Sequence, residues 1–163
     1  MDYLWTPWRY RYVAEAGKDN ACIFCSALAA NDDAGRRILH RGRLNFIILN
    51  LYPYTTGHSM IVPYKHVPDL AGCDAQTLAE LMLLAQRLQM ALARIYHPEG
   101  FNLGMNLGRC AGAGVTGHVH MHVLPRWSGD SSFMTTVSET RLHPEDLDQT
   151  YAKLRAEFSG ASP

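Results

Sequence analysis

Residues 118–122 read His-Val-His-Met-His, so three of the chain's eight histidines fall within five positions. Val119, Met121 and Val123 alternate with them. Successive side chains of a strand point to opposite faces, so this period of two predicts a strand. Its apolar residues would face the core, and its three imidazoles would lie on the other face, about 6.5–7 Å apart. Imidazole titrates near neutral pH, and a row of such groups is typical of phosphate chemistry or metal binding.

This row of histidines supports two interpretations. In the first, a His-X-His pair holds a metal ion, as in many zinc sites. In the second, one imidazole attacks phosphorus through one ring nitrogen, while the other nitrogen keeps its proton in a hydrogen bond. Residues 108–117, directly before the row, form a loop with four glycines. Such small residues let backbone N–H groups approach phosphate oxygens.

Size and charge restrict the partners of the chain. Its 163 residues are enough for one domain with a buried core, and 15 basic residues balance 15 acidic ones. This balance argues against a long nucleic-acid partner, whereas a small anionic ligand needs only a few local donors. We find no apolar run of the roughly 18–20 residues that a membrane span requires.

The N-terminal residues and the four cysteines predict a cytoplasmic protein. Residues 1–5 have neither the basic nor the apolar region of a signal peptide. In a reducing compartment, Cys22-Ile23-Phe24-Cys25 is a metal half-site or a redox pair rather than a structural disulfide. A tetrahedral metal site needs two further ligands, for which His66 and one histidine of the row are candidates by residue type.

Hydrophobic periodicity predicts an α+β fold with an antiparallel sheet. Strands are expected near 36–40 and over 44–51, 58–62, 101–107 and the histidine row. Helices are expected over 23–30, over 75–96 with Asp74 as its cap, and at the end of the chain. In that last helix Pro144 fits the first turn, and Leu147, Tyr151, Leu154 and Phe158 form the apolar stripe. Residues 132–138 are expected to form an edge strand or a flap.

The helix expected over 75–96 has a broad apolar face. Leu83, Leu84 and Met90 extend its stripe beyond what one sheet is expected to cover. A second, symmetry-related helix would cover the remainder, so the sequence predicts a homodimer.

The segment His118-Val119-His120-Met121-His122-Val123-Leu124 resembles the signature of the histidine triad (HIT) family in full. The Cys22–Cys25 pair, the block from Asn50 to His66, the long helix and the segment from Asn102 to Gly108 lie in the family order. The resemblance covers about residues 20–128. Residues 4–9 and 125–130 are similar to a bacterial branch that includes diadenosine tetraphosphate phosphorylases.

The resemblance implies an antiparallel sheet of about five strands with two main helices, dimerised through the long helix. The expected organisation is a single HIT domain over residues 1–163, with its core at about 20–128. An N-terminal segment, 1–19, would pack on this core, and a C-terminal flap and helix would occupy 131–158.

The resemblance also implies roles for individual residues in nucleotidyl transfer. His120 would be the nucleophile toward the α-phosphorus, His122 would bind the phosphate oxygens, and His118 would complete the catalytic triad. Asn50 would hold the ribose and Asn106 would lie near the scissile phosphate. The remaining expected nucleotide contacts are the backbone of Gly112, Gly114 and Val115 and an apolar wall for the base made by Phe24, Leu44 and Phe46.

Zinc-bearing bacterial members of the family use a Cys-X-X-Cys pair and two histidines that match Cys22, Cys25, His66 and His118. The resemblance thus implies a closed, structural zinc site, and no carboxylate cluster offers a second, catalytic metal site. Many members carry Gln-Ser or Gln-Thr shortly before the first histidine, where this chain has Gly114-Val115. This difference removes a side-chain hydroxyl that helps the leaving group, so catalysis would depend more on backbone donors and Asn106.

The expected reaction is nucleotidyl transfer from an AMP-containing dinucleoside polyphosphate through a nucleotidyl-histidine. Phosphate as acceptor gives a diadenosine tetraphosphate phosphorylase, and water gives an asymmetric hydrolase. A nitrogen leaving group gives a purine nucleoside phosphoramidase. A non-catalytic nucleotide sensor, or a zinc-stabilised interaction module, is the alternative of a different class.

Overall fold

The computed structural model describes residues 21–130, 133–138 and 144–160. The expected N-terminal packing segment, 1–19, lies outside the described residues, as do 131–132 and 139–143 of the expected flap.

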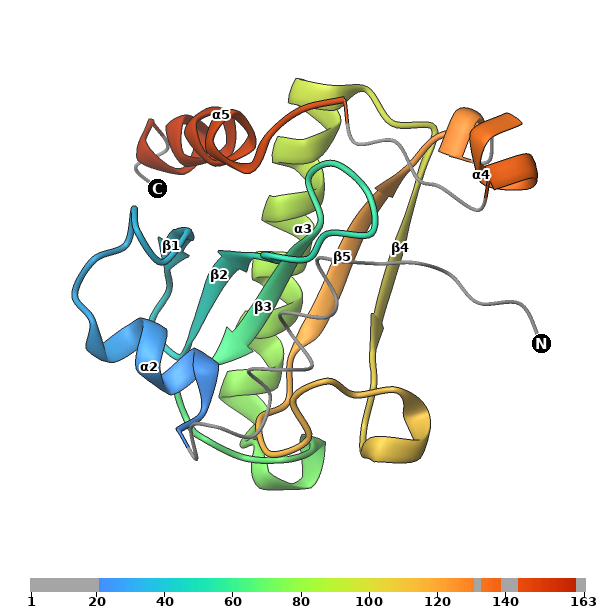
Figure 1. The fold of residues 1–163 in the computed structure, drawn as a ribbon. Coiled ribbons are helices and arrows are strands. Elements are labelled where there is room, and N and C mark those ends of the chain that lie inside the picture. Colours follow the sequence, from blue (N-terminus) through green and yellow to red (C-terminus); the bar gives the residue numbers. More distant parts are fainter. Residues whose placement is uncertain (1–20, 131–132, 139–143, 161–163) are drawn as a thin grey trace.

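A single five-stranded sheet forms the centre of the molecule (Figure 1). Its order is β1-β2-β3-β5-β4, and every neighbouring pair is antiparallel. The strands are β1 (Ile38–Arg41), β2 (Asn45–Leu49), β3 (Ser59–Pro63), β4 (Gly100–Met105) and β5 (Met121–Arg126). The predicted α+β fold with an antiparallel sheet of five strands is confirmed.

Two helices pack on one face of this sheet. Helix α3 (Ala75–Tyr96) contacts β2, β3 and β5, while α5 (Leu147–Ser159) contacts β1 and α3 (Figure 1). The side chain of Asp74 caps α3 by accepting the N–H of Thr77 at 2.7 Å, as expected. The stripe of α5 is also confirmed: Leu154 and Phe158 are buried, and Tyr151 packs against the same core.

The opposite face of the sheet is covered by α2 (Ile23–Ala29) and carries the candidate site. Alternation along the strands separates the two faces: Ile47 and Ile61 point to α3, whereas Phe46 and Met60 point to α2. Phe24 of α2 joins this second apolar cluster. The candidate site is thus built on a rigid, well-packed sheet face.

Three expected elements differ from those found. Residues 133–138, expected as an edge strand or flap, form the short helix α4 (Phe133–Ser138). Pro144 is not in the first turn of α5, because Asp146 caps that helix by accepting the N–H of Gln149. The strand with the histidine row begins only at Met121, so His118 and His120 lie before the ladder of β5. The segment before Met121 thus keeps the alternating sequence pattern of a strand without belonging to the hydrogen-bonded ladder of β5.

The apolar face of α3 is partly covered within the chain. Leu84, expected to need a second molecule, is buried in the core instead. Met82, Leu83 and Met90 remain exposed, by 55, 64 and 53% respectively. An apolar stripe therefore stays open on the side of α3 that turns away from the sheet.

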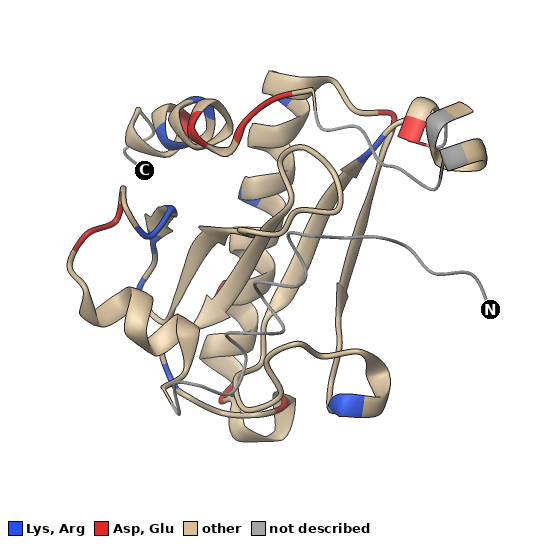
Figure 2. Cartoon of the chain, in the orientation of Figure 1, with Lys and Arg blue, Asp and Glu red and all other residues tan. Residues whose placement is uncertain are grey.

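Charged residues are spread along the described part of the chain. Figure 2 shows basic positions on several elements, with acidic positions between them. Within the same described part, no helix combines the length and the hydropathy that crossing a bilayer demands.

Candidate functional site

The start of β5 brings the histidines to the face of the sheet that α2 covers. Met121 and Val123 point to the α3 side, so His122 points to the other side. Its register partners are Met60 on β3 and Gly104 on the edge strand β4. A Cβ atom built on Gly104 would meet no heavy atom within 4 Å, so the space beside His122 toward β4 is open.

His120 is buried between aromatic rings. Its ring lies 5.1 Å from that of Phe24 and 4.9 Å from that of His122, between ring centroids. The latter is shorter than the roughly 6.5–7 Å expected along a regular strand, because His120 precedes the ladder and the two rings meet edge to face. Nδ1 of His120 lies 2.9 Å from the carbonyl oxygen of His118. A carbonyl can only accept, so Nδ1 carries the proton and Nε2 of the neutral ring has a free lone pair.

A fourth histidine, His58, orients His122. The backbone N–H of Tyr54 donates to Nδ1 of His58 at 3.1 Å, so the proton of the neutral His58 ring lies on Nε2. That Nε2–H lies 2.9 Å from Nδ1 of His122 and donates to it. We therefore assign the remaining proton of His122 to its Nε2, where it can be donated to a ligand. From the sequence, His58 was expected only as the first residue of a strand. It lies within the segment from Asn50 to His66 that resembles the HIT family, but no role was predicted for it.

The electrostatics of the site keep these imidazoles neutral. Burial, followed by the neighbouring His122 and His120, lowers the pKa of His58 to about 3. Burial, with a smaller effect of His120, lowers the pKa of His122 to about 4. Burial also lowers the pKa of His120, opposed by its hydrogen bond to the carbonyl of His118. A neutral imidazole keeps one nitrogen lone pair. Attack on phosphorus requires such a lone pair, and so does a hydrogen bond from one ring to another.

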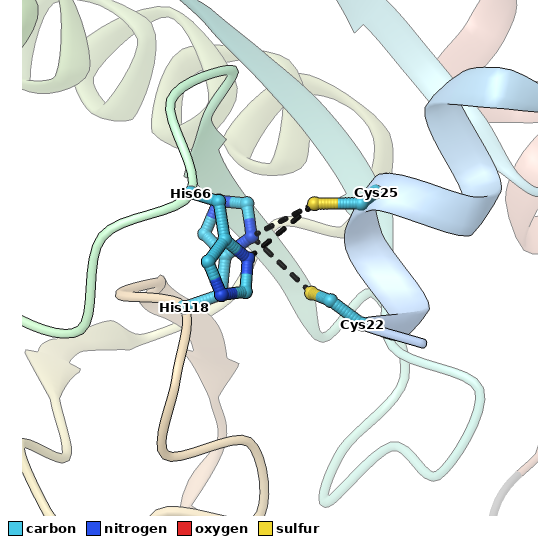
Figure 3. A group of neighbouring side chains, drawn as sticks. All are labelled: Cys22, Cys25, His66 and His118. Carbon is cyan, nitrogen blue, oxygen red and sulfur yellow. Dashed lines mark hydrogen bonds between the residues drawn. The ribbon is translucent and has the colours of Figure 1, made fainter. Parts of the chain in front are cut away.

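The four residues expected as metal ligands meet at one point. Ligand atoms of Cys22, Cys25, His66 and His118 all lie within 4.8 Å of one another (Figure 3). Sγ of Cys22 is 3.3 Å from Nδ1 of His118, and Sγ of Cys25 is 3.4 Å from Nδ1 of His66. Zinc–sulfur bonds of about 2.3 Å and zinc–nitrogen bonds of about 2.0 Å place tetrahedral ligand atoms about 3.5 Å apart. The two sulfur–nitrogen separations are close to this value and the other pairs lie within 4.8 Å, so the donor set suits a Cys2His2 zinc site.

His118 is prepared for this cluster by its second ring nitrogen. Nε2 lies 2.9 Å from the carbonyl oxygen of Pro63 and must donate to it. Nδ1, which faces the cysteines in Figure 3, is consequently unprotonated. A metal-binding histidine usually has such an outer partner, which fixes its tautomer.

The two asparagines expected to contact the nucleotide, Asn106 and Asn50, reach the histidines from different parts of the sheet. Asn106 directly follows β4, whose last residue Met105 pairs with Met121, so it is adjacent to the start of β5. Asn50 accepts the N–H of Tyr52 at 2.9 Å through Oδ1, while its Nδ2 lies 3.4 Å from the ring nitrogens of His58. The amide oxygen of Asn50 thus stabilises the loop after β2, while its amide nitrogen lies beside His58.

The residues expected to form an apolar wall for the nucleobase lie mostly buried beneath the site, not on an open surface. Phe46 is fully buried and stacks on Tyr64 with 5.7 Å between ring centroids. Phe24 is buried against the rings of His118 and His120, whereas Leu44 is half-buried. In the glycine loop, Gly112 and Gly114 are exposed and Val115 packs against the cluster of Phe24 and Phe46. Gly112 has a φ of +87°, a conformation that a side chain would strain.

Comparison with known proteins places this site in a family. The HIT domain pattern matches residues 33–129. The chain is 37% identical to the AP-4-A phosphorylase of Mycobacterium tuberculosis over 98% of this chain and 85% of that protein. It is 28% identical to a bis(5'-nucleosyl)-tetraphosphatase (asymmetrical) of Schizosaccharomyces pombe, over 77% of this chain and 69% of that protein.

A solved structure shares the fold of this chain. The zinc-bound histidine triad family protein from Mycobacterium smegmatis superposes with a TM-score of 0.70 and 30% identity, covering 86% of this chain and 94% of that one. With the complete His-X-His-X-His segment on a matching fold, the chain belongs to the histidine triad (HIT) family.

Proposed function

We propose that this protein transfers the nucleoside monophosphate group of a dinucleoside polyphosphate through a covalent adduct on His120. The observation that carries the proposal is the hydrogen bond from Nδ1 of His120 to the carbonyl of His118, at 2.9 Å. It leaves the lone pair of Nε2 free to attack the α-phosphorus. The bond from phosphorus to the bridging oxygen then breaks, and the remaining polyphosphate leaves. In the second step, phosphate or water displaces His120 from phosphorus.

His122 supports this transfer as a hydrogen-bond donor. Because its Nδ1 accepts from His58, its Nε2–H is free to stabilise a phosphate oxygen on which negative charge develops. Removal of one such preorganised donor typically lowers kcat about 10²–10³-fold. The open space at Gly104 gives the phosphate chain room beside His122, and Asn106 and the glycine loop supply further donors.

We further propose that Cys22, Cys25, His66 and His118 hold a zinc ion. The support is the convergence of their ligand atoms within 4.8 Å and the tautomer that the carbonyl of Pro63 imposes on His118. Zinc bound there would be structural, since four protein ligands leave no position for water. It would fix His118, whose carbonyl oxygen orients the nucleophile, and would hold α2 against the sheet.

We also propose that the active form is a homodimer. Met82, Leu83 and Met90 expose apolar surface on α3, and the edge strand β4 exposes Leu103. A second copy of the same helix would remove this apolar surface from water.

The reaction is tested by incubating the protein with diadenosine tetraphosphate, with and without phosphate, and separating the products. We expect ADP and ATP when phosphate is present, as for the AP-4-A phosphorylase that this chain resembles. His120→Ala should abolish turnover, whereas His97→Asn, at an exposed histidine beyond α3, should not. Binding of AMP without turnover of any adenylyl substrate would contradict an enzymatic role and favour a nucleotide sensor.

A second candidate is an asymmetric hydrolase, which the similarity to the fission-yeast tetraphosphatase favours. The same assay separates the two reactions. AMP and ATP, formed at the same rate with and without phosphate, would identify water as the acceptor.

A further inference from the structure

Tyr54 lies on the loop between β2 and β3, beside the pair of histidines formed by His58 and His122. Its ring centroid is 4.8 Å from that of His58 at an angle of 43°, and 6.3 Å from that of His122 at 26°. Separations of about 4.5–7 Å are those of rings in direct contact. Tyr54 itself is 46% exposed, whereas His58 is fully buried. Since His122 is itself half-buried, the ring of Tyr54 covers one side of the pair and does not close it off from solvent.

We propose that Tyr54 is a positioning residue for the reaction, and that its ring shields one side of the hydrogen-bonded pair of His58 and His122 from water and so helps to keep both rings neutral. The proposal rests on the proposed function for its catalytic consequence. The contact itself concerns only the described side chains and can be tested without substrate.

Two parts of Tyr54 act on the pair in different ways. Its backbone N–H, 3.1 Å from Nδ1 of His58, sets the tautomer of that ring. Its side chain makes the ring contacts, which place the phenol ring against one side of both imidazoles. A substitution at position 54 keeps the backbone donor and removes the ring, so the two contributions can be separated by experiment.

Loss of the cover has a defined electrostatic consequence. Burial is the largest cause of the lowered pKa of both His58 and His122. Water admitted beside these rings would stabilise their protonated forms, so both pKa values would rise. Protonation of His122 turns its Nδ1 from an acceptor into a donor, and the hydrogen bond from His58 is then lost.

Other titratable groups face the same pair and stay unchanged in a Tyr54 variant. His120 is in ring contact with His122 at 4.9 Å. Glu145 and Asp146, which begin the segment leading into α5, line a cavity of about 230 Å³ together with His58. The carboxylate of Glu145 is held by the hydroxyl of Tyr96 at 3.0 Å and by Lys153 at 2.8 Å. A change in the pair on substitution of Tyr54 is therefore assigned to the ring.

The test uses NMR of imidazole nitrogens in the full chain, which reports the tautomer and the pKa of each histidine. Signals of the pair are assigned with His58→Gln and His122→Asn. In Tyr54→Ala, we expect the pKa of at least one of the two to rise by about one unit or more, with the tautomer of His58 unchanged. Tyr54→Phe should keep the original values, because the ring and not the hydroxyl provides the cover. Leu51→Ala, at an exposed residue of the same loop, is the matched control.

Each other outcome overturns the proposal. Unchanged pKa values in Tyr54→Ala would show that the ring does not shield the pair. A shift of the His58 proton from Nε2 to Nδ1 in that variant would show that the ring only holds the loop in place. With diadenosine tetraphosphate, the acid limb of the pH–rate profile should move to higher pH in Tyr54→Ala and return in Tyr54→Phe. If the protein turned over no dinucleotide, the proposed function would fail, while the NMR titration would still decide the role of Tyr54.

Discussion

Nε2 of His58 lies 2.9 Å from Nδ1 of His122, and the backbone N–H of Tyr54 determines which of these two rings donates. The third residue of the histidine row therefore has its proton on the nitrogen that can reach a ligand. The loop between β2 and β3 thus fixes, through His58, the tautomer of His122 on β5.

Substitution of His58 should lower the turnover number without removing the nucleophile. In His58→Gln, His122 loses the donor that selects its tautomer, so we expect kcat to fall at least about 10-fold. KM should change less, because His58 is fully buried. Steady-state kinetics with diadenosine tetraphosphate give both values. The control is His40→Gln, the same change at a half-buried histidine on β1. Equal kcat values for His58→Gln and wild type would contradict this role.

Stability should fall as the pH is lowered below the ordinary histidine pKa of 6.5. The pKa of folded His58 is about 3 and that of His122 about 4, so between pH 6.5 and 4 the unfolded chain binds more protons than the folded one. The free energy of unfolding therefore decreases with falling pH, by up to about 1.4 kcal/mol per pH unit for the buried His58 and by less for the half-buried His122, where solvent screens the charge. Urea unfolding at pH 7 and pH 5 measures the decrease.

His122→Asn should show a smaller decrease over the same range. Metal release at low pH would affect both proteins, so the difference between them isolates His122. A wild-type stability that is equal at pH 5 and pH 7 would refute the prediction.

Removal of either cysteine of the proposed zinc site should remove the metal. For Cys22→Ser and Cys25→Ser we expect less than one zinc per chain by elemental analysis and a lower melting temperature, because ligand binding stabilises the folded state. Cys73→Ser and Cys110→Ser are matched controls, since neither thiol joins the cluster. Wild-type protein purified without metal, with reactive Cys22 and Cys25, would speak against the site.

A charge on the exposed face of α3 should dissociate the proposed dimer. In Leu83→Glu and Met90→Glu, each side chain would have to bury a carboxylate in the interface, which costs several kcal/mol. Light scattering after gel filtration should give the mass of one chain for these variants and of two for wild type. Leu70→Glu, at another exposed apolar residue, should remain dimeric. A monomeric wild type would contradict the proposal.

Periodicity alone predicted most of the fold. The spacing of Leu81, Leu88 and Leu92 indicated α3, whose bounds at Ala75 and Tyr96 coincide with those expected. The strands were placed within a few residues, because β2 and β3 are continuous runs of buried residues rich in β-forming types. The helix at 133–138 was expected as a strand or flap, since six residues are too few to establish a helical period.

The candidate site was predicted by residue type more than by geometry. Cys22 and Cys25 are 41 residues or more from His66 and His118, and only the resemblance to a family suggested that the four meet. The fold brings them within 4.8 Å of one another. The role of His58 was missed, because its tautomer depends on a backbone N–H that only the shape of the loop positions.

The central claim is that His120 takes the nucleotide covalently, and the mass of the protein during turnover tests it most directly. The reaction with diadenosine tetraphosphate would be quenched under mild alkaline conditions, where a phosphoramidate survives, and the adduct located by peptide mapping. We expect a mass increase of one AMP residue on the peptide that contains His120 in wild type, and none in His120→Ala. Consumption of the substrate without any adduct on His120 would contradict it.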